Sequence, residues 1–138
     1  MLTGDQLTAK EKELVYEEID LEAQKEEIIE LKNDYEELTE YLKDAKENVE
    51  DAIDLVESAI TNYTMGYYGS ETATQNADEL TTRKETLDSI RGGINKTKNL
   101  VDQRIEDLGE DERNIDEEID DIQAELQEIR RQIWLNKY

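Results

Sequence analysis

Carboxylates are the side chains of this sequence with the greatest potential for chemistry. The chain carries 38 aspartates and glutamates, and pairs such as Glu106 with Glu110 or Asp116 with Asp120 lie four residues apart. Carboxylates at helical spacing can bind a divalent cation or act as acid and base, but both tasks need a partly enclosed site. The chain has no histidine and no cysteine to complete one. We therefore expect no catalysis, no cofactor and no specific metal site, and we interpret the acidic runs as solvated helix surface.

One segment, 107–118, superficially resembles a calcium-binding loop. It lacks the alternating oxygen ligands around a central glycine that such a loop needs. An apolar seven-residue spacing also continues through it at Leu108, Ile115 and Ile122. A helix therefore fits this segment better than a loop.

The elements that position these side chains are two long runs of apolar residues spaced seven apart, which we call the ladders. The first ladder is Leu7, Leu14, Leu21, Ile28, Tyr35, Leu42, Val49, Val56 and Tyr63, and the second is Leu80, Leu87, Ile94, Val101, Leu108, Ile115, Ile122 and Ile129. A seven-residue repeat stays on one helix face only when the helix supercoils against another helix. The absence of proline agrees, because one proline inside a helix costs roughly 3 kcal/mol. The ladders predict an all-α fold, a long antiparallel two-helix coiled coil.

The break between the ladders sets the predicted boundaries. Glycines, tyrosines, serines and threonines cluster in 63–76 and favour a turn. We predict one helical hairpin over residues 1–138, with a first helix over about 5–62, a tip loop over about 63–76 and a second helix over about 77–135. Thr3 or Asp5 is the expected cap of the first helix, and Thr74 or Asn76 that of the second.

Each helix needs a second row of residues beside its ladder, here called the companion row. In the first helix we expect it three residues after the ladder, at Lys10, Glu17, Gln24, Leu31, Leu38, Ala45, Ala52 and Ala59. In the second helix we expect it four residues after the ladder, at Lys84, Arg91, Lys98, Ile105, Glu112, Ile119, Leu126 and Ile133. With ladder facing ladder, the numbers of facing residues add up to about 136 to 139.

This register gives two expectations. It places Lys84, Arg91 and Lys98 opposite the acidic stretch 38–55, so these cations are expected to bridge to the first helix and fix the pairing, the alternative being contact with a partner. It also sets Ile119, Leu126 and Ile133 opposite a polar row, which would leave apolar surface half covered.

Apolar residues outside the ladders favour association with another chain. Those we expect to face a partner are Val15, Ile19, Ile29, Tyr41, Ile90 and Trp134, and Ile53, Leu55 and Ile60 add to the excess. Two helices bury only a narrow stripe each, so the excess predicts further helices from another molecule or a second copy. Gly92 and Gly93 predict a weak point, a kink or a place where another helix comes close.

Composition limits the classes of partner and the location. A formal charge of −22 makes nucleic acids and anionic membranes poor partners, because like charges repel. No stretch has the length of apolar residues that a membrane span or an ordinary secretory signal requires. We expect a protein that is cytoplasmic when made and that, if exported, leaves without a cleaved signal peptide.

The tip carries Tyr67, Tyr68 and Gly69, followed by Ser70 and Ala73. A helical hairpin with an aromatic-x-Gly tip resembles the Trp-x-Gly superfamily of small helical type VII secretion proteins, and in particular the helical companion proteins of LXG-type toxins. Tyrosine stands here where that family usually has tryptophan. The family also carries a Tyr-x-x-x-Asp/Glu export element, and the nearest string here runs from Tyr16 to Asp20, near the start of the chain.

The resemblance implies a non-enzymatic targeting or chaperone-like partner of a type VII secreted toxin, bound to the toxin's helical N-terminal domain or to a second small hairpin protein. Two other interpretations stay open. One is a structural or tethering coiled coil, such as a phage or cell-envelope spacer. The other is an acidic chaperone that holds unfolded clients between its arms.

Overall fold

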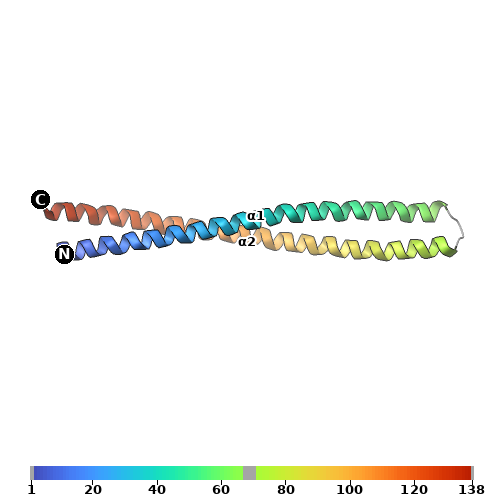
Figure 1. Ribbon diagram of the computed structural model, residues 1–138, viewed down its shortest axis with the longest axis horizontal. Coiled ribbons are helices and arrows are strands. Elements are labelled where there is room, and N and C mark those ends of the chain that lie inside the picture. Colours follow the sequence, from blue (N-terminus) through green and yellow to red (C-terminus); the bar gives the residue numbers. More distant parts are fainter. Residues whose placement is uncertain (1, 67–70, 138) are drawn as a thin grey trace. The chain divides into compact units, whose positions relative to one another are not determined.

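The chain folds into two long helices that pack against each other. The computed structural model describes the backbone of residues 2–66 and 71–137, and the side chains of these residues except 65, 66, 72 and 73. Helix α1 spans Gly4–Gly66 and helix α2 spans Glu71–Lys137 (Figure 1). The predicted all-α helical hairpin is confirmed.

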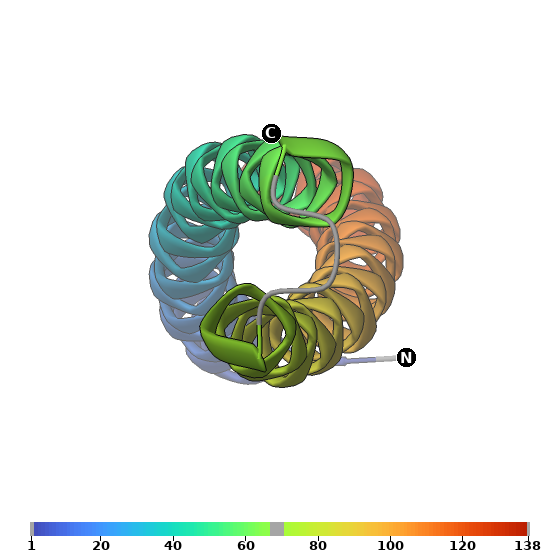
Figure 2. The ribbon, with the colours of Figure 1, turned by 90° about the vertical axis from the view of Figure 1, so that its right-hand side faces the viewer.

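The hairpin divides into two compact units. Unit 1 pairs Met1–Asp34 with Ile105–Tyr138, and unit 2 is Tyr35–Arg104. Within each unit, one stretch of α1 and one stretch of α2 lie on opposite sides of a common axis (Figure 2).

The predicted tip boundaries were wrong. α1 continues four residues beyond the predicted end, to Gly66, and α2 begins six residues before the predicted start, at Glu71. The threonines that suggested a loop are accommodated in the helix, because Thr64 Oγ1 donates a hydrogen bond to the carbonyl of Ile60 at 2.8 Å. Thr74 and Asn76 lie inside α2 and therefore do not cap it.

The start of α1 is fixed by a reciprocal pair of hydrogen bonds. Gln6 N donates to Thr3 Oγ1 at 3.2 Å, and Thr3 N donates to Gln6 Oε1 at 2.9 Å. This is a capping box, in which two backbone N–H groups left free by the helix geometry are satisfied by side chains. Of the two predicted caps, Thr3 is the one used.

The ladders form the core. Every ladder residue is buried or half-buried, and the most enclosed side chains include Leu7 and Leu14, each 1% exposed. In unit 1, these two leucines cluster with Leu126 and Ile129, and Ile133 packs against the cluster. The ion pairs between the helices give the register: Lys25 with Asp116, Glu11 with Arg130 and Glu57 with Lys84 each have numbers that add up to 141, beyond the predicted 136 to 139. Leu14 and Leu126, whose numbers add up to 140, share the core cluster.

The register shift corrects the predicted companion row of α1. The buried or half-buried row lies four residues after the ladder, as it does in α2: Glu11, Glu18, Lys25, Lys32, Thr39, Lys46, Ile53 and Ile60. The row predicted to face α2 is only partly covered: Glu17, Gln24, Leu31 and Leu38 are exposed, whereas Lys10, Ala45, Ala52 and Ala59 are half-buried. The prediction failed because it selected the row with the least charge, whereas lysine and glutamate can cover a seam with their aliphatic stems and keep their charges in water.

The same shift shows that one expectation about the open end of the hairpin was wrong, namely that the apolar surface of α2 is only half covered there. Ile119 and Leu126 are 7% and 4% exposed, and Leu126 packs against the first two leucines of the α1 ladder. These residues are therefore covered by their own chain and give no reason to expect another one.

The corrected row makes a direct prediction about Ile53, which is 4% exposed in the structure. Ile53→Ala should lower the free energy of unfolding by about 2 to 4 kcal/mol, because it removes buried methyl groups and leaves a cavity. Ile19→Ala, at a position 59% exposed, should change it by less than about 0.5 kcal/mol. Urea denaturation followed by circular dichroism measures both. Equal effects would contradict the corrected row.

Candidate protein-interaction surface

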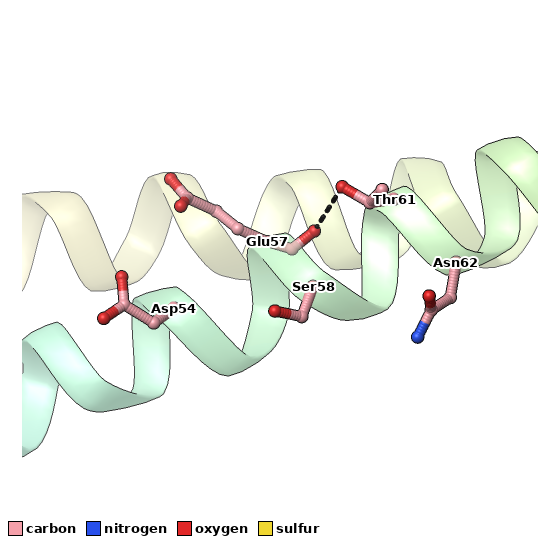
Figure 3. Close-up of a pocket in the computed structure, with 5 residues that line it drawn as sticks. All are labelled: Asp54, Glu57, Ser58, Thr61 and Asn62. Atoms are coloured by element: carbon pink, nitrogen blue, oxygen red, sulfur yellow. Dashed lines mark hydrogen bonds between the residues drawn. The ribbon is translucent and has the colours of Figure 1, made fainter.

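Hollows on the described surface of the hairpin are lined partly by acidic and other polar side chains. The one drawn in Figure 3 is lined by Asp54, Glu57, Ser58, Thr61 and Asn62, all on one face of α1. The Thr61 hydroxyl donates to the Glu57 carbonyl at 3.0 Å, and the Glu57 carboxylate pairs with Lys84. Among the described residues, no group of three or more acidic, histidine or cysteine side chains is placed to hold a metal ion.

Ion pairs across the seam are the main polar feature of the structure. In unit 1, Lys25 Nζ lies 2.6 Å from Asp116 Oδ1, Lys32 Nζ 3.8 Å from Glu112 Oε2, and Arg130 Nε 3.1 Å from Glu11 Oε2. In unit 2, Lys84 Nζ lies 3.0 Å from Glu57 Oε1. Each of these pairs includes a companion-row residue: Glu11, Lys25 and Lys32 of α1 and Lys84 of α2. Other charged companion-row residues pair within their own helix, as Lys46 does with Glu50.

Two of these pairs shift the pKa of their lysines upward. A hydrogen bond to Asp116 raises the pKa of Lys25 above its usual 10.5, and a hydrogen bond to Glu57 does the same for Lys84. In both cases the charged lysine is stabilised by its partner. Near the end of α2 a carboxylate is stabilised in its charged form instead. Hydrogen bonds from Arg131 and Gln132 lower the pKa of Glu128 to about 2.

The three predicted register cations differ in what they contact. Lys84 bridges to α1, through Glu57, which lies just beyond the predicted acidic stretch. Arg91 instead pairs with Asp88 of its own helix at 3.1 Å. Lys98 is half-buried and has no ion pair within the described residues. The ion pairs that join the two helices are therefore that of Lys84 and those of unit 1, and they add to a register set by the apolar core. The sequence interpretation missed the unit 1 pairs because it assigned α1 the wrong companion row.

The residues predicted from the family resemblance lie in different places. Tyr67, Tyr68 and Gly69 lie outside the described residues. Tyr16 and Asp20 are on the exposed surface of α1 in unit 1, where Tyr16 is 64% exposed and Asp20 Oδ2 accepts a hydrogen bond from Gln24 Nε2 at 3.0 Å.

Four of the six residues predicted to face a partner are exposed. They are Ile19, Tyr41, Ile90 and Trp134. Val15 packs against the unit 1 core cluster, and Ile29 is half-buried beside a hollow between the helices. Ile53 and Ile60, counted as excess apolar residues, belong to the corrected companion row.

Leu100 is an exposed apolar residue that the sequence interpretation missed. It is 71% exposed and, like Tyr41 and Leu55, lies six residues after a ladder position. Comparing every heptad position, instead of only the two expected in the core, would have found it. The exposed apolar residues of unit 2 are thus confined to few heptad positions.

Comparison with known proteins leaves the family open. No family model matches the chain, and searches of curated proteins and of solved structures found no match either. Within the described part of the chain, neither helix contains a segment long and apolar enough to cross a membrane.

The raised lysine pKa values predict a specific loss of stability at high pH. A raised folded-state pKa contributes stability below the unfolded pKa, near 10.5, and that contribution disappears as the pH rises through the folded value. The variant Lys25→Arg/Lys84→Arg should retain its melting temperature further into the range from about pH 10.5 to 12, because arginine stays charged there.

The matched control for that measurement is Lys12→Arg/Lys96→Arg. Both lysines are exposed and make no ion pair among the described residues. Melting curves of this control should follow the unmodified protein. If the two double variants behave alike, the seam pairs do not contribute to stability.

Proposed function

We propose that this protein is a non-enzymatic helical interaction protein that packs laterally against a helical partner. The observation that carries this proposal is the set of large apolar side chains left exposed on the hairpin, such as Ile19 at 59% and Trp134 at 60%. Tryptophan contributes strongly when it is buried at a protein interface, and burying an isoleucine side chain is favourable by about 1.5 to 3 kcal/mol.

The charged companion row supports the same proposal. A two-helix seam with lysine and glutamate at many of its inner positions has fewer apolar contacts than an ordinary coiled coil. Additional helices stabilise such a hairpin by completing a bundle. The net charge of −22 meanwhile keeps the unbound protein soluble.

We further propose that the partner is the helical N-terminal domain of a type VII secreted toxin, with this chain as its targeting or chaperone-like companion. The support is the resemblance of the hairpin and its Tyr67, Tyr68 and Gly69 tip to the companion proteins of that system. Tyr16 and Asp20, the nearest string to an export element, are both accessible on α1.

Affinity purification from the native host tests the partner. The tagged chain should recover a protein with a helical N-terminal domain fused to a toxin domain, and Ile19→Glu/Trp134→Glu should lose it while retaining its helical circular dichroism. Recovery of phage tail, capsid or cell-envelope proteins instead would contradict the toxin-companion proposal.

The tip has a separate test. Tyr67→Ala/Gly69→Ala should abolish export of the complex, because the aromatic-x-Gly tip is proposed to join a recognition surface, and should leave helix content and partner binding unchanged. Immunoblots of culture supernatant and cell lysate measure this. Normal export of the double variant would exclude a role for the tip.

A further inference from the structure

α1 carries a second repeating row in unit 2, which we call the uncharged stripe. Its eight residues recur at alternating spacings of three and four: Leu38, Tyr41, Ala45, Asn48, Ala52, Leu55, Ala59 and Asn62. Tyr41 and Leu55 are 71% and 73% exposed, and Leu38 is 38% exposed. Alternating three-four spacing is the pattern of a helix-packing seam. Ala45, Ala52 and Ala59 are half-buried at the edge of the first seam, whereas the other five residues are exposed. The outer side of this stripe is therefore a second seam that the chain itself leaves exposed.

The adjoining surface of α2 also has few charges. One hollow between the helices shows which residues of α2 adjoin the stripe. It is lined by residues of both helices: Ala59, Tyr63, Asn76, Glu79, Leu80 and Arg83. The stripe side of α1 therefore lies beside the α2 residues that are three and six positions after the α2 ladder. In unit 2 these α2 residues are Asn76, Glu79, Arg83, Thr86, Ile90, Gly93, Thr97, Leu100 and Arg104. We call the stripe and these residues together the neutral face.

Charge identifies what the neutral face can bind. It holds one glutamate and two arginines, in a chain whose formal charge is −22. The hollow of Figure 3, with Asp54 and Glu57, lies on a different face of α1 and reaches the stripe only at Asn62. A basic partner would prefer the acidic faces. A second copy of this chain is repelled by them and can approach closely at the neutral face.

The stripe is complementary in shape to itself. When two copies of α1 lie antiparallel, with a two-fold axis near residue 50, the numbers of facing residues add up to 100. Tyr41 then faces Ala59 of the second copy, Ala45 faces its Leu55, and Asn48 faces its Ala52. Large side chains thus meet small ones along the stripe, as interdigitated packing requires.

The same axis also pairs the α2 residues. The register of the hairpin places residue 50 of α1 beside about residue 90 of α2, so the axis passes close to Ile90 and Gly93. Ile90 then lies over Gly93 of the second copy, and Arg104 lies near its Glu79. Neither Arg104 nor Glu79 has an ion pair within the described residues of a single chain.

This arrangement accounts for the glycine at position 93. A Cβ atom built there meets nothing within 4 Å, so packing within the chain does not require glycine. Glycine inside a helix costs about 1 kcal/mol relative to alanine. The close approach of Ile90 from a second copy supplies a reason for keeping it.

We propose that the neutral face of unit 2 is the interface of an antiparallel homodimer, in which two copies form a four-helix bundle. The stripe spans 38–62, about 36 Å at 1.5 Å per residue, and two helices are together about 20 Å wide. The face therefore offers about 700 Å² per copy, close to the roughly 800 Å² typical of a stable interface. The proposal concerns association of the chain with itself and does not rest on the identity of a toxin partner.

Sedimentation equilibrium of the purified full chain tests the homodimer. The unmodified protein should sediment at twice its 16.1 kDa mass at micromolar concentration. Tyr41→Glu/Leu55→Glu should raise the dissociation constant at least about 30-fold, as loss of an interface hot spot does. Leu2→Glu/Leu135→Glu, at exposed positions of unit 1, should remain dimeric. A monomeric unmodified protein, including one that associates only with a different helical chain, would overturn the proposal.

The adjacent glycines give a matched pair of variants. Gly93→Leu should weaken the dimer and preserve or increase the helix content, because a Cβ atom there meets nothing within 4 Å in the monomer, whereas a leucine side chain would occupy the place of Ile90 from the second copy. The side chain of a leucine at position 92 would point about 100° away around the helix, so the Gly92→Leu protein should dimerise normally. Equal dissociation constants for the two variants would contradict the two-fold arrangement.

Disulfide trapping distinguishes the orientation of the copies. The chain has no cysteine, so mixing Tyr41→Cys protein with Ala59→Cys protein allows one designed link. Oxidation should give mostly the mixed 41–59 disulfide, because residues 41 of the two copies would lie about 27 Å apart along the axis. Mostly 41–41 and 59–59 links would indicate a parallel pairing and overturn the proposed geometry.

Discussion

The hairpin depends on a register in which the ladder of each helix faces the companion row of the other. The apolar companion residues of α2 lie at the open end, where Leu126 packs against Leu7 and Leu14 of the α1 ladder. Pairing ladder with ladder would instead leave these residues opposite lysine and glutamate. Because burying a large aliphatic side chain contributes about 1.5 to 3 kcal/mol, a few such contacts outweigh the modest energies of exposed ion pairs and select the observed register.

The register has two consequences for the rest of the molecule. It brings the charged companion residues of α1 into the seam, where Lys25 and Lys32 find acidic partners on α2. It also places the row three residues after the α1 ladder at the edge of the seam, where Ala45, Ala52 and Ala59 are half-buried and form one side of the uncharged stripe. Charged seam positions favour one pairing over its alternatives at some loss of stability. An open second seam in turn favours bundle formation over an isolated hairpin.

Much of the fold could be predicted from the ladders, because a seven-residue apolar repeat has few structural solutions. The choice of companion row could not be predicted by hydrophobicity alone, since the aliphatic stems of Lys25 and Lys32 cover the seam as well as smaller residues do. The tip boundaries were missed because Thr64 bonds to a helical carbonyl instead of interrupting the helix. The exposure of Tyr41 and Trp134 could be predicted, because both lie outside the ladders. The burial of Ile53 could not be predicted without knowing the register of the two helices.

The most direct measurement of this register is disulfide formation between engineered cysteines across the seam of unit 2. Ile53→Cys/Leu87→Cys should oxidise rapidly to an intramolecular disulfide, because these residue numbers add up to 140, as those of Leu14 and Leu126 in the unit 1 core cluster do. Ile53→Cys/Lys84→Cys should oxidise slowly, because residue 84 is offset from that register by three residues, about 4.5 Å along the helix. Faster oxidation of the second pair would show that the register is wrong, and with it the assignment of the companion row and of the neutral face.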